Sequence, residues 1–197
     1  MEDPRTTDPQ PIMDCSTVFL DRDGVINQDS PDYIKCWEDF RFIPGSRKAI
    51  ARLTKAGIRV ILITNQSMIN RGMVPLKTLE EMHMKLLRAV SNKGGSITDI
   101  FYCPHRPDEN CSCRKPKPGL IWAARDRYGI DLSKSAMVGD SAKDVLAGKA
   151  AGCSKTVLVR TGNGCQALLE LQSAGIQPDH VASGLKTAVD WIVGKRK

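Results

Sequence analysis

Short runs of apolar, largely β-branched residues alternate along the chain with longer stretches in which apolar residues recur every three or four positions. The short runs lack the polar alternation of a half-exposed strand, so they are typical of strands buried on both faces of a parallel sheet. We predict six such strands, at 17–20, 60–64, 97–102, 136–138, 156–159 and 181–182.

The longer stretches have the spacing of amphipathic helices. Ala49, Ile50 and Leu53 share one helical face, and so do Leu79, Met82, Leu86 and Val90. Four more helices are predicted at 120–128, 142–151, 165–174 and 185–193. Alternating strands and helices predict an α/β fold with a doubly wound parallel sheet, in which ligands bind beyond the carboxyl ends of the strands.

The length of 197 residues fits one domain, which we place at residues 15–197. The preceding residues, 1–14, are rich in acids and prolines, and we expect them to be a disordered extension. They lack the basic start and apolar run of a secretory signal, and no apolar stretch is long enough to cross a bilayer. We therefore expect a cytoplasmic, monomeric protein with no membrane partner.

Acidic side chains follow the first predicted strand directly. Asp21 and Asp23 flank Arg22 and precede Gly24, a residue that permits a sharp turn. Two carboxylates this close repel each other unless a cation or a shared proton intervenes. Mg²⁺ is a natural partner because it takes carboxylate and phosphate oxygens together.

Three further segments bring polar groups towards the same predicted edge. Asp140 follows the fourth strand and would complete a set of carboxylates for the metal. Thr64 ends the second strand and is followed by the polar run Asn65-Gln66-Ser67, while Arg114 and Lys115 precede a predicted helix. A phosphate among these groups would have its charge offset from several sides.

Seven cysteines are present, and three of them lie between positions 103 and 113. Cys103, His105, Cys111 and Cys113 supply three thiols and an imidazole, which suit tetrahedral Zn²⁺. A site filled by four protein ligands is structural, so we predict a zinc-stabilised loop that also fixes Arg114 and Lys115.

Four motifs resemble those of the haloacid dehalogenase (HAD) superfamily of aspartate-nucleophile phosphatases: FLDRDG at 19–24, ITNQ at 63–66, RKP at 114–116 and VGD at 138–140. The resemblance implies a HAD-like Rossmannoid fold in which Asp21 attacks phosphorus and Asp23 acts as general acid and base. It also implies that Thr64 and Lys115 hold the phosphoryl oxygens. Mg²⁺ would be bound by Asp21, Asp140 and the backbone carbonyl of Asp23.

The zinc loop narrows the resemblance to two subgroups, the D-glycero-D-manno-heptose 1,7-bisphosphate 7-phosphatases and the histidinol-phosphate phosphatases. The chain resembles the heptose subgroup more closely, through the Asn65-Gln66-Ser67 run, Arg71-Gly72 and the segment 114–119. This resemblance implies a role in the pathway to ADP- or GDP-heptose for lipopolysaccharide core or surface glycans. It suggests eight substrate contacts: Asn27, Asp29, Tyr33, Asn65, Gln66, Ser67, Arg71 and Arg114.

The segments between the motifs are too short for a large cap domain, so an open site walled by loops is expected. A function of another class, a zinc-stabilised nucleic-acid-binding module, is suggested by the net charge of +7 and the cysteine loop. The basic residues are spread along the chain, however, and acids at the strand ends would repel a phosphate backbone without a metal. We expect no nucleic-acid partner and a small phosphorylated sugar instead.

Overall fold

In the computed structural model, which describes residues 15–194, six parallel strands form one sheet with the order β3-β2-β1-β4-β5-β6. The strands are β1 (Thr17–Leu20), β2 (Arg59–Asn65), β3 (Asp99–Cys103), β4 (Ser135–Gly139), β5 (Lys155–Val159) and β6 (His180–Ala182). The chain order reverses at β1, so the carboxyl ends of β1, β2 and β4 meet at a topological switch point.

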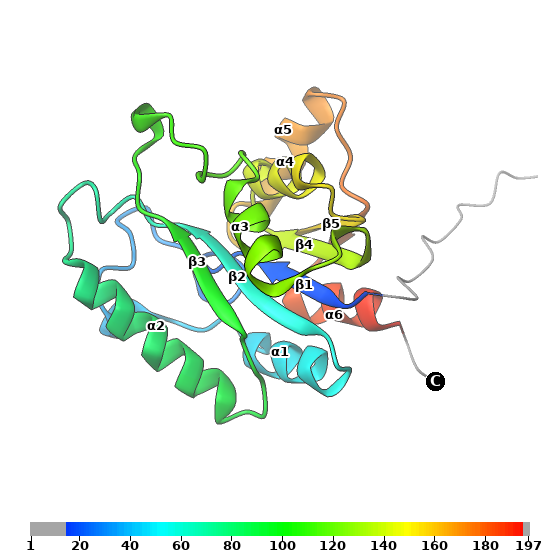
Figure 1. Cartoon of the computed structure of the whole chain (residues 1–197), viewed down its shortest axis with the longest axis horizontal. Helices are drawn as coiled ribbons and strands as arrows, with labels where there is room; N and C mark the ends of the chain where they lie inside the picture. The colour runs from blue at the N-terminus through cyan, green and yellow to red at the C-terminus, as the bar shows by residue number, and fades with distance from the viewer. Residues whose placement is uncertain (1–14, 195–197) are drawn as a thin grey trace, which may run out of the picture.

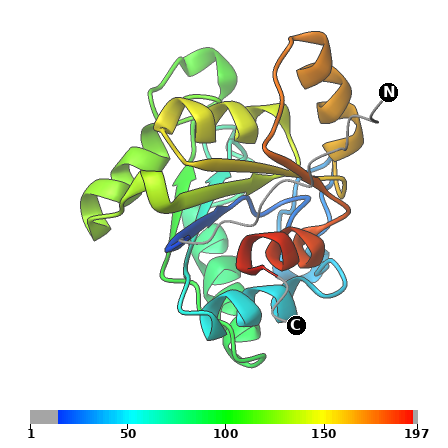
Figure 2. The same ribbon diagram turned by 90° about the vertical axis from the view of Figure 1, so that its right-hand side faces the viewer.

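Helices cover both faces of the sheet (Figures 1 and 2). One face carries α1 (Ser46–Lys55), α2 (Leu76–Ser91) and α6 (Leu185–Val193), and the other carries α3 (Gly119–Tyr128), α4 (Ala142–Ala151) and α5 (Gly164–Ser173). The predicted doubly wound α/β fold is confirmed. The predicted strand at 97–102 begins later, at Asp99, because Ile97 packs against the core ahead of the paired strand.

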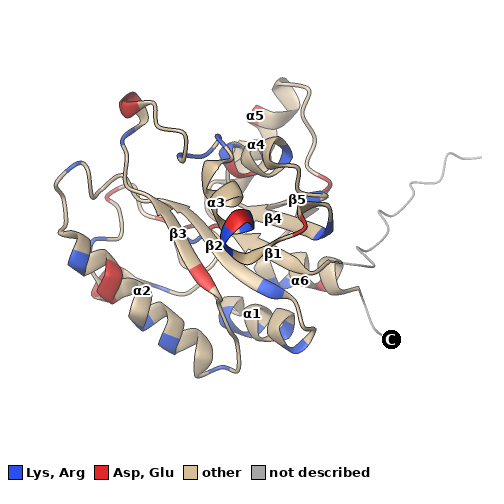
Figure 3. Cartoon of the chain, viewed as in Figure 1, with Lys and Arg blue, Asp and Glu red and all other residues tan. Residues whose placement is uncertain are grey.

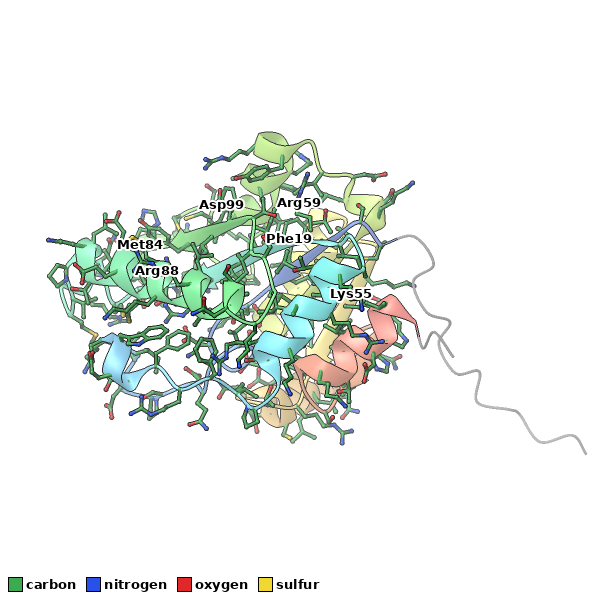
Figure 4. All side chains as sticks on the ribbon, turned by 90° about the horizontal axis from the view of Figure 1, so that it is seen from below. Phe19, Lys55, Arg59, Met84, Arg88 and Asp99 are labelled. Atoms are coloured by element: carbon green, nitrogen blue, oxygen red, sulfur yellow. The ribbon has the colours of Figure 1, made fainter. Side chains whose placement is uncertain are left out.

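Alternate side chains of each strand enter opposite cores. Val18 and Leu20 pack against α1, α2 and α6, while Phe19 between them points to the other face and packs with residues of α3 and α4. Phe19 is fully buried in the middle of the molecule (Figure 4). This two-sided burial explains why the strands lack polar alternation.

The connection from β1 to α1 is ordered by its own aromatic cluster. Phe40 lies 5.0 Å from both Trp37 and Phe42 between ring centroids, and Phe40 is buried. The short 3₁₀ turn at Trp37–Asp39 is the only helical segment in this connection. The described chain therefore carries no large cap domain, as the sequence predicted, and this compact connection forms one wall of the site.

Charged side chains are distributed over several elements (Figure 3), with Lys and Arg on α1, α2 and α4. None of the helices within residues 15–194 is both long and apolar enough to span a membrane. The predicted disorder of residues 1–14 falls outside the described part of the chain.

Candidate active site

A cavity of about 270 Å³ opens beyond the carboxyl ends of β1, β2 and β4. Its walls come from the loops that follow these strands, the segment 29–34, the turn at Arg114-Lys115 and the loop after β5. The lining includes Asp21, Asp23, Thr64, Lys115 and Asp140. The cavity therefore unites groups from Asp21 to Asn163, which are 142 positions apart in the sequence.

Lys115 links the carboxylates at the base of this cavity. Its Nζ lies 2.9 Å from Asp21 Oδ1 and 2.6 Å from Asp144 Oδ1, and it donates to the Ile63 carbonyl at 2.7 Å. The backbone N–H of Arg22 also donates to Asp21 Oδ1, at 2.7 Å. Burial alone would lower the pKa of Lys115, but Asp144 and Asp21 outweigh it and raise this pKa, so the ammonium stays charged.

One ammonium does not balance the acids around it. The nearest carboxylate oxygens of Asp21, Asp140 and Asp144 all lie within 4.8 Å of one another. Burial and the neighbouring Asp144 raise the pKa of Asp140 to about 7, and burial raises the pKa of Asp21 despite the opposing effect of Lys115. The donor set consists of hard oxygens with uncompensated negative charge, so it fits a divalent cation such as Mg²⁺.

Asp23 is held apart from this carboxylate group. Its carboxylate accepts hydrogen bonds from Arg22 Nη2 at 2.9 and 3.0 Å, from Gln66 Nε2 at 2.9 Å and from Asn27 Nδ2 at 2.8 Å. Burial opposes the ionised form, but Arg22 and these hydrogen bonds outweigh it and lower the pKa of Asp23. The predicted role of Asp23 in metal binding therefore rests on its backbone carbonyl, because its side chain is engaged elsewhere.

Two glycines make room for Asp140. Gly24 and Gly162 both have positive φ, at 76° and 57°, and a Cβ on either would lie 2.0–2.1 Å from Asp140 Oδ2. The same oxygen accepts the backbone N–H of Asn163 at 2.8 Å. Thr161 completes this clamp by donating its hydroxyl to the Gly24 carbonyl at 2.6 Å. The loop after β5 thus fixes both the Asp140 carboxylate and the turn that follows Asp23.

The polar run after β2 has a supporting role in addition to lining the cavity. The Asn65 side chain exchanges two hydrogen bonds of 3.2 Å with the backbone of Lys115. Gln66 Nε2 donates to Thr64 Oγ1 at 2.8 Å as well as to Asp23. These amides hold the residues predicted to contact phosphate in fixed positions.

Cys103, His105, Cys111 and Cys113 converge at the end of β3. Cys113 Sγ lies 3.3 Å from Cys103 Sγ, 3.4 Å from Cys111 Sγ and 3.3 Å from His105 Nδ1. Burial and the neighbouring thiols raise the pKa of Cys113 to about 12, so the cluster resists full ionisation without a cation. The four donors and their separations fit tetrahedral zinc, as predicted.

The other predicted contacts divide into two groups. Asp29, Tyr33, Asn65, Gln66 and Arg114 line the cavity, while Asn27, Ser67 and Arg71 are not among its lining residues. Asn27 is fully buried and donates to Asp23 and to the Gln28 carbonyl, so it supports the site from beneath. Ser67 is also buried, and Arg71 lies on the exposed loop after β2. Whether these three residues contact a bound substrate remains a prediction, and Asn27 and Ser67 are buried outside the cavity lining.

Several residues of the site were given no role from the sequence. Asp144 lies four residues beyond Asp140 on α4, and this spacing is the signal that could have identified it. Asn163 follows β5, where the strand-end rule that selected Asp21 and Asp140 applies equally. The contact between Arg22 and His83 could not be predicted from the sequence, because these two residues are 61 positions apart.

Comparison with known proteins agrees with this geometry. Residues 112–188 match the HAD-hydrolase-like family model. The chain is 50% identical to the D-glycero-β-D-manno-heptose-1,7-bisphosphate 7-phosphatase of Pseudomonas aeruginosa, over 79% of this chain and 87% of the relative. It is 40% identical to the α-heptose enzyme of Photorhabdus laumondii, over 74% and 82% of the two chains.

A crystal structure of the D,D-heptose 1,7-bisphosphate phosphatase from B. bronchiseptica, complexed with magnesium and phosphate, superposes with a TM-score of 0.84. The sequence identity is 42%, and the match covers 89% of this chain and 96% of the relative. The fold and the carboxylate cavity define a HAD-like phosphatase. Within this class, the chain belongs to the family of D-glycero-D-manno-heptose-1,7-bisphosphate 7-phosphatases.

Proposed function

We propose that the protein removes the 7-phosphate of D-glycero-D-manno-heptose 1,7-bisphosphate in the heptose pathway to surface glycans. The observation that carries this proposal is the joint presence in one cavity of Asp21, Asp140 and Lys115, in a chain 50% identical to a phosphatase of that substrate. An open cavity without a cap also suits a substrate with a charged group at each end.

In the first chemical step, a carboxylate oxygen of Asp21 forms a bond to phosphorus as the bond to the sugar O7 breaks. The electron pair of the broken bond goes to O7, which takes a proton from Asp23; Asp23 must first bind this proton, because Arg22 and its other donors favour its ionised form in the free protein. Lys115 and the N–H of Arg22 both hold Asp21 through Oδ1, which fixes the direction of attack. Thr64 and Lys115 bind the phosphoryl oxygens.

In the second step, Asp23 removes a proton from water, and the water oxygen attacks phosphorus to release phosphate and regenerate Asp21. Mg²⁺, held by Asp21, Asp140 and the backbone carbonyl of Asp23, would supply charge neutralisation for the phosphoryl group. Zn²⁺ on the cysteine loop has a structural role. Asp29, Tyr33, Gln66 and Arg114 line the cavity where the remainder of the sugar would lie.

The test is a comparison of kcat/KM for the α and β anomers of heptose 1,7-bisphosphate with kcat/KM for histidinol phosphate, in the presence of Mg²⁺. We expect a preference for one heptose anomer of at least about 100-fold, and phosphorus NMR should show that the 1-phosphate is retained. A preference for histidinol phosphate would overturn the substrate assignment while leaving the phosphatase chemistry in place.

We further propose that residues 15–197 act as one domain and that the protein works as a cytoplasmic monomer. The short connections between the elements and the single continuous sheet support the one-domain proposal. Light scattering after size-exclusion chromatography tests the oligomeric state, and a mass of about twice 21.7 kDa would contradict the monomer.

A further inference from the structure

The side chain of His83 lies on the inner face of α2 and has no part in the chemistry above. It is largely buried, and its Nε2 lies 3.4 Å from Nη1 of Arg22, a guanidinium that is itself 1% exposed. A buried arginine is costly unless its donors are paired. His83 supplies the partner for Nη1.

The direction of this hydrogen bond is fixed by chemistry. A guanidinium has only donors, so Nε2 of His83 must be the acceptor and the proton of the neutral ring must be on Nδ1. Burial and the charge of Arg22 lower the pKa of His83 to about 3, so the ring stays neutral over the physiological range. His83 is therefore a permanent acceptor behind Arg22.

The remaining donors of Arg22 point towards the cavity. Nε and Nη2 both donate to Asp23 Oδ1, and Nη2 also reaches Asp23 Oδ2 and Gln66 Oε1. The Cζ atom of Arg22 lies 5.9 Å from the centre of the Phe40 ring. Arg22 thus joins the histidine at one edge to Asp23 at the other, and a rotation of its guanidinium would disrupt three of the hydrogen bonds that hold the Asp23 carboxylate.

We propose that His83 is a positioning residue that holds Nη1 of Arg22 and thereby aims the carboxyl group of Asp23 at the leaving oxygen of the substrate. This inference rests on the proposed phosphatase function, because it concerns the step in which Asp23 gives its proton to the departing alcohol. A proton donor is effective only within hydrogen-bond reach of the atom that it protonates.

The leaving group provides the test. A nitrophenolate leaves phosphorus without a proton, whereas a nitrobenzyl alkoxide needs one. Because kcat/KM reports the steps up to expulsion of the alcohol, 4-nitrophenyl and 4-nitrobenzyl phosphate isolate the contribution of Asp23 as an acid. In His83→Leu we expect kcat/KM for the benzyl ester to fall at least about tenfold more than for the phenyl ester.

Two further variants control for packing. His83→Gln retains an acceptor and should recover most of the lost rate on the benzyl ester. Met84→Leu alters the next residue of α2, which is exposed and lies on the helix seen in Figure 4, and should leave the ratio of the two esters unchanged. An equal loss on both esters in His83→Leu, or no loss on either, would overturn the positioning role.

A measurement on the unaltered protein is independent of turnover and of how the variants fold. Nitrogen NMR of labelled histidine should show Nε2 of His83 unprotonated and Nδ1 protonated from pH 5 to 8. A proton on Nε2 would overturn the inference whether or not the protein hydrolyses heptose bisphosphate. Absence of phosphoester turnover combined with the expected tautomer would instead overturn the proposed function and, with it, the role of His83 in catalysis.

Discussion

The two predicted metal sites are built in opposite ways. The acidic site lies at the edge of the sheet, where Asp144 is fully buried and Lys115 provides an internal cation. The cysteine site lies in the loop that follows β3, and residues 106–110 of this loop are all exposed. Apart from Cys103, which is buried in the core, this loop has little apolar surface of its own to bury.

This difference indicates what each metal does. Hydrogen bonds and two ion pairs of Lys115 already hold the acidic site, so Mg²⁺ would add chemistry to an arrangement that the fold supplies. In the cysteine loop three thiols and an imidazole converge, and the ion pair between Arg106 and Asp108 lies on the exposed surface, so we expect the order of this loop to depend on zinc. The two sites are adjacent in the sequence, because Cys113 is followed directly by Arg114 and Lys115. Loss of the metal from the cysteine site should therefore alter the position of Lys115.

The largest effect should follow from Asp21→Asn, which keeps the shape of the side chain but removes the nucleophile. We expect kcat/KM to fall at least about 10³-fold, with little change in the thermal unfolding midpoint. Steady-state kinetics and calorimetry on the purified variant measure both quantities. Asp126→Asn, at an exposed residue of α3, serves as the control, and substantial turnover by Asp21→Asn would rule out the covalent route.

Replacing a zinc ligand tests the link between the two sites. In Cys111→Ser we expect loss of bound zinc, a fall in kcat/KM of about 10- to 100-fold, and a thermal midpoint lower by about 5 °C or more. Metal analysis, kinetics and calorimetry give the three readouts. Cys165→Ser alters an exposed thiol outside the cluster and should change none of them. Normal activity in a zinc-free variant would separate the two sites.

Asp144→Asn tests whether the negative charge that pairs with Lys115 contributes to kcat. Asn can still accept from Ser141, whose backbone N–H and hydroxyl contact Asp144 Oδ2 at 3.0 and 2.6 Å, but it is neutral and removes the ion pair with Lys115. We expect kcat to fall about tenfold. Asp131 accepts from Ser133 at the same two distances but is not among the residues that line the cavity, so Asp131→Asn is a matched control that should retain full activity.

The smallest effect concerns pH and the stability of the protein without added Mg²⁺. Because the folded pKa of Asp140 is raised from 3.8 to about 7, the folded state binds more protons than the unfolded state between these values. Stability should therefore fall modestly as pH rises from about 4 to 7. Denaturant unfolding at several pH values measures this slope. It should flatten in Asp140→Asn and after addition of Mg²⁺, and an unchanged slope in Asp140→Asn would contradict this assignment.

The sequence was most informative about features that repeat along the chain. Apolar runs located all six strands, and helical spacing located the helices to within a few residues, because burial on two faces of a sheet leaves a periodic signal. The cysteine and histidine spacing likewise predicted the cluster. The catalytic roles of Asp21, Asp23, Thr64 and Lys115 remain predictions, although the structure brings all four to one cavity.

What the sequence could not supply were pairings made in space. The contact of Arg22 with His83 joins a loop to a helix, and the ion pair of Lys115 with Asp144 joins the zinc loop to α4. Asn27 was expected to meet substrate because of the resemblance to the heptose phosphatases, and the structure shows it buried and bonded to Asp23. Neither polarity nor position along the chain tells whether an amide faces the ligand or supports the residues that do.

The close approach of Gly24 and Gly162 to Asp140 limits how this enzyme can diversify. Any side chain at either glycine would collide with the Asp140 carboxylate, so mutational tolerance there should be nearly nil. Residues 29–33 face no such barrier, because none of them is buried and most of them line the cavity. New substrate preferences can therefore arise from substitutions in this wall of the cavity while the residues proposed for phosphoryl transfer stay constant.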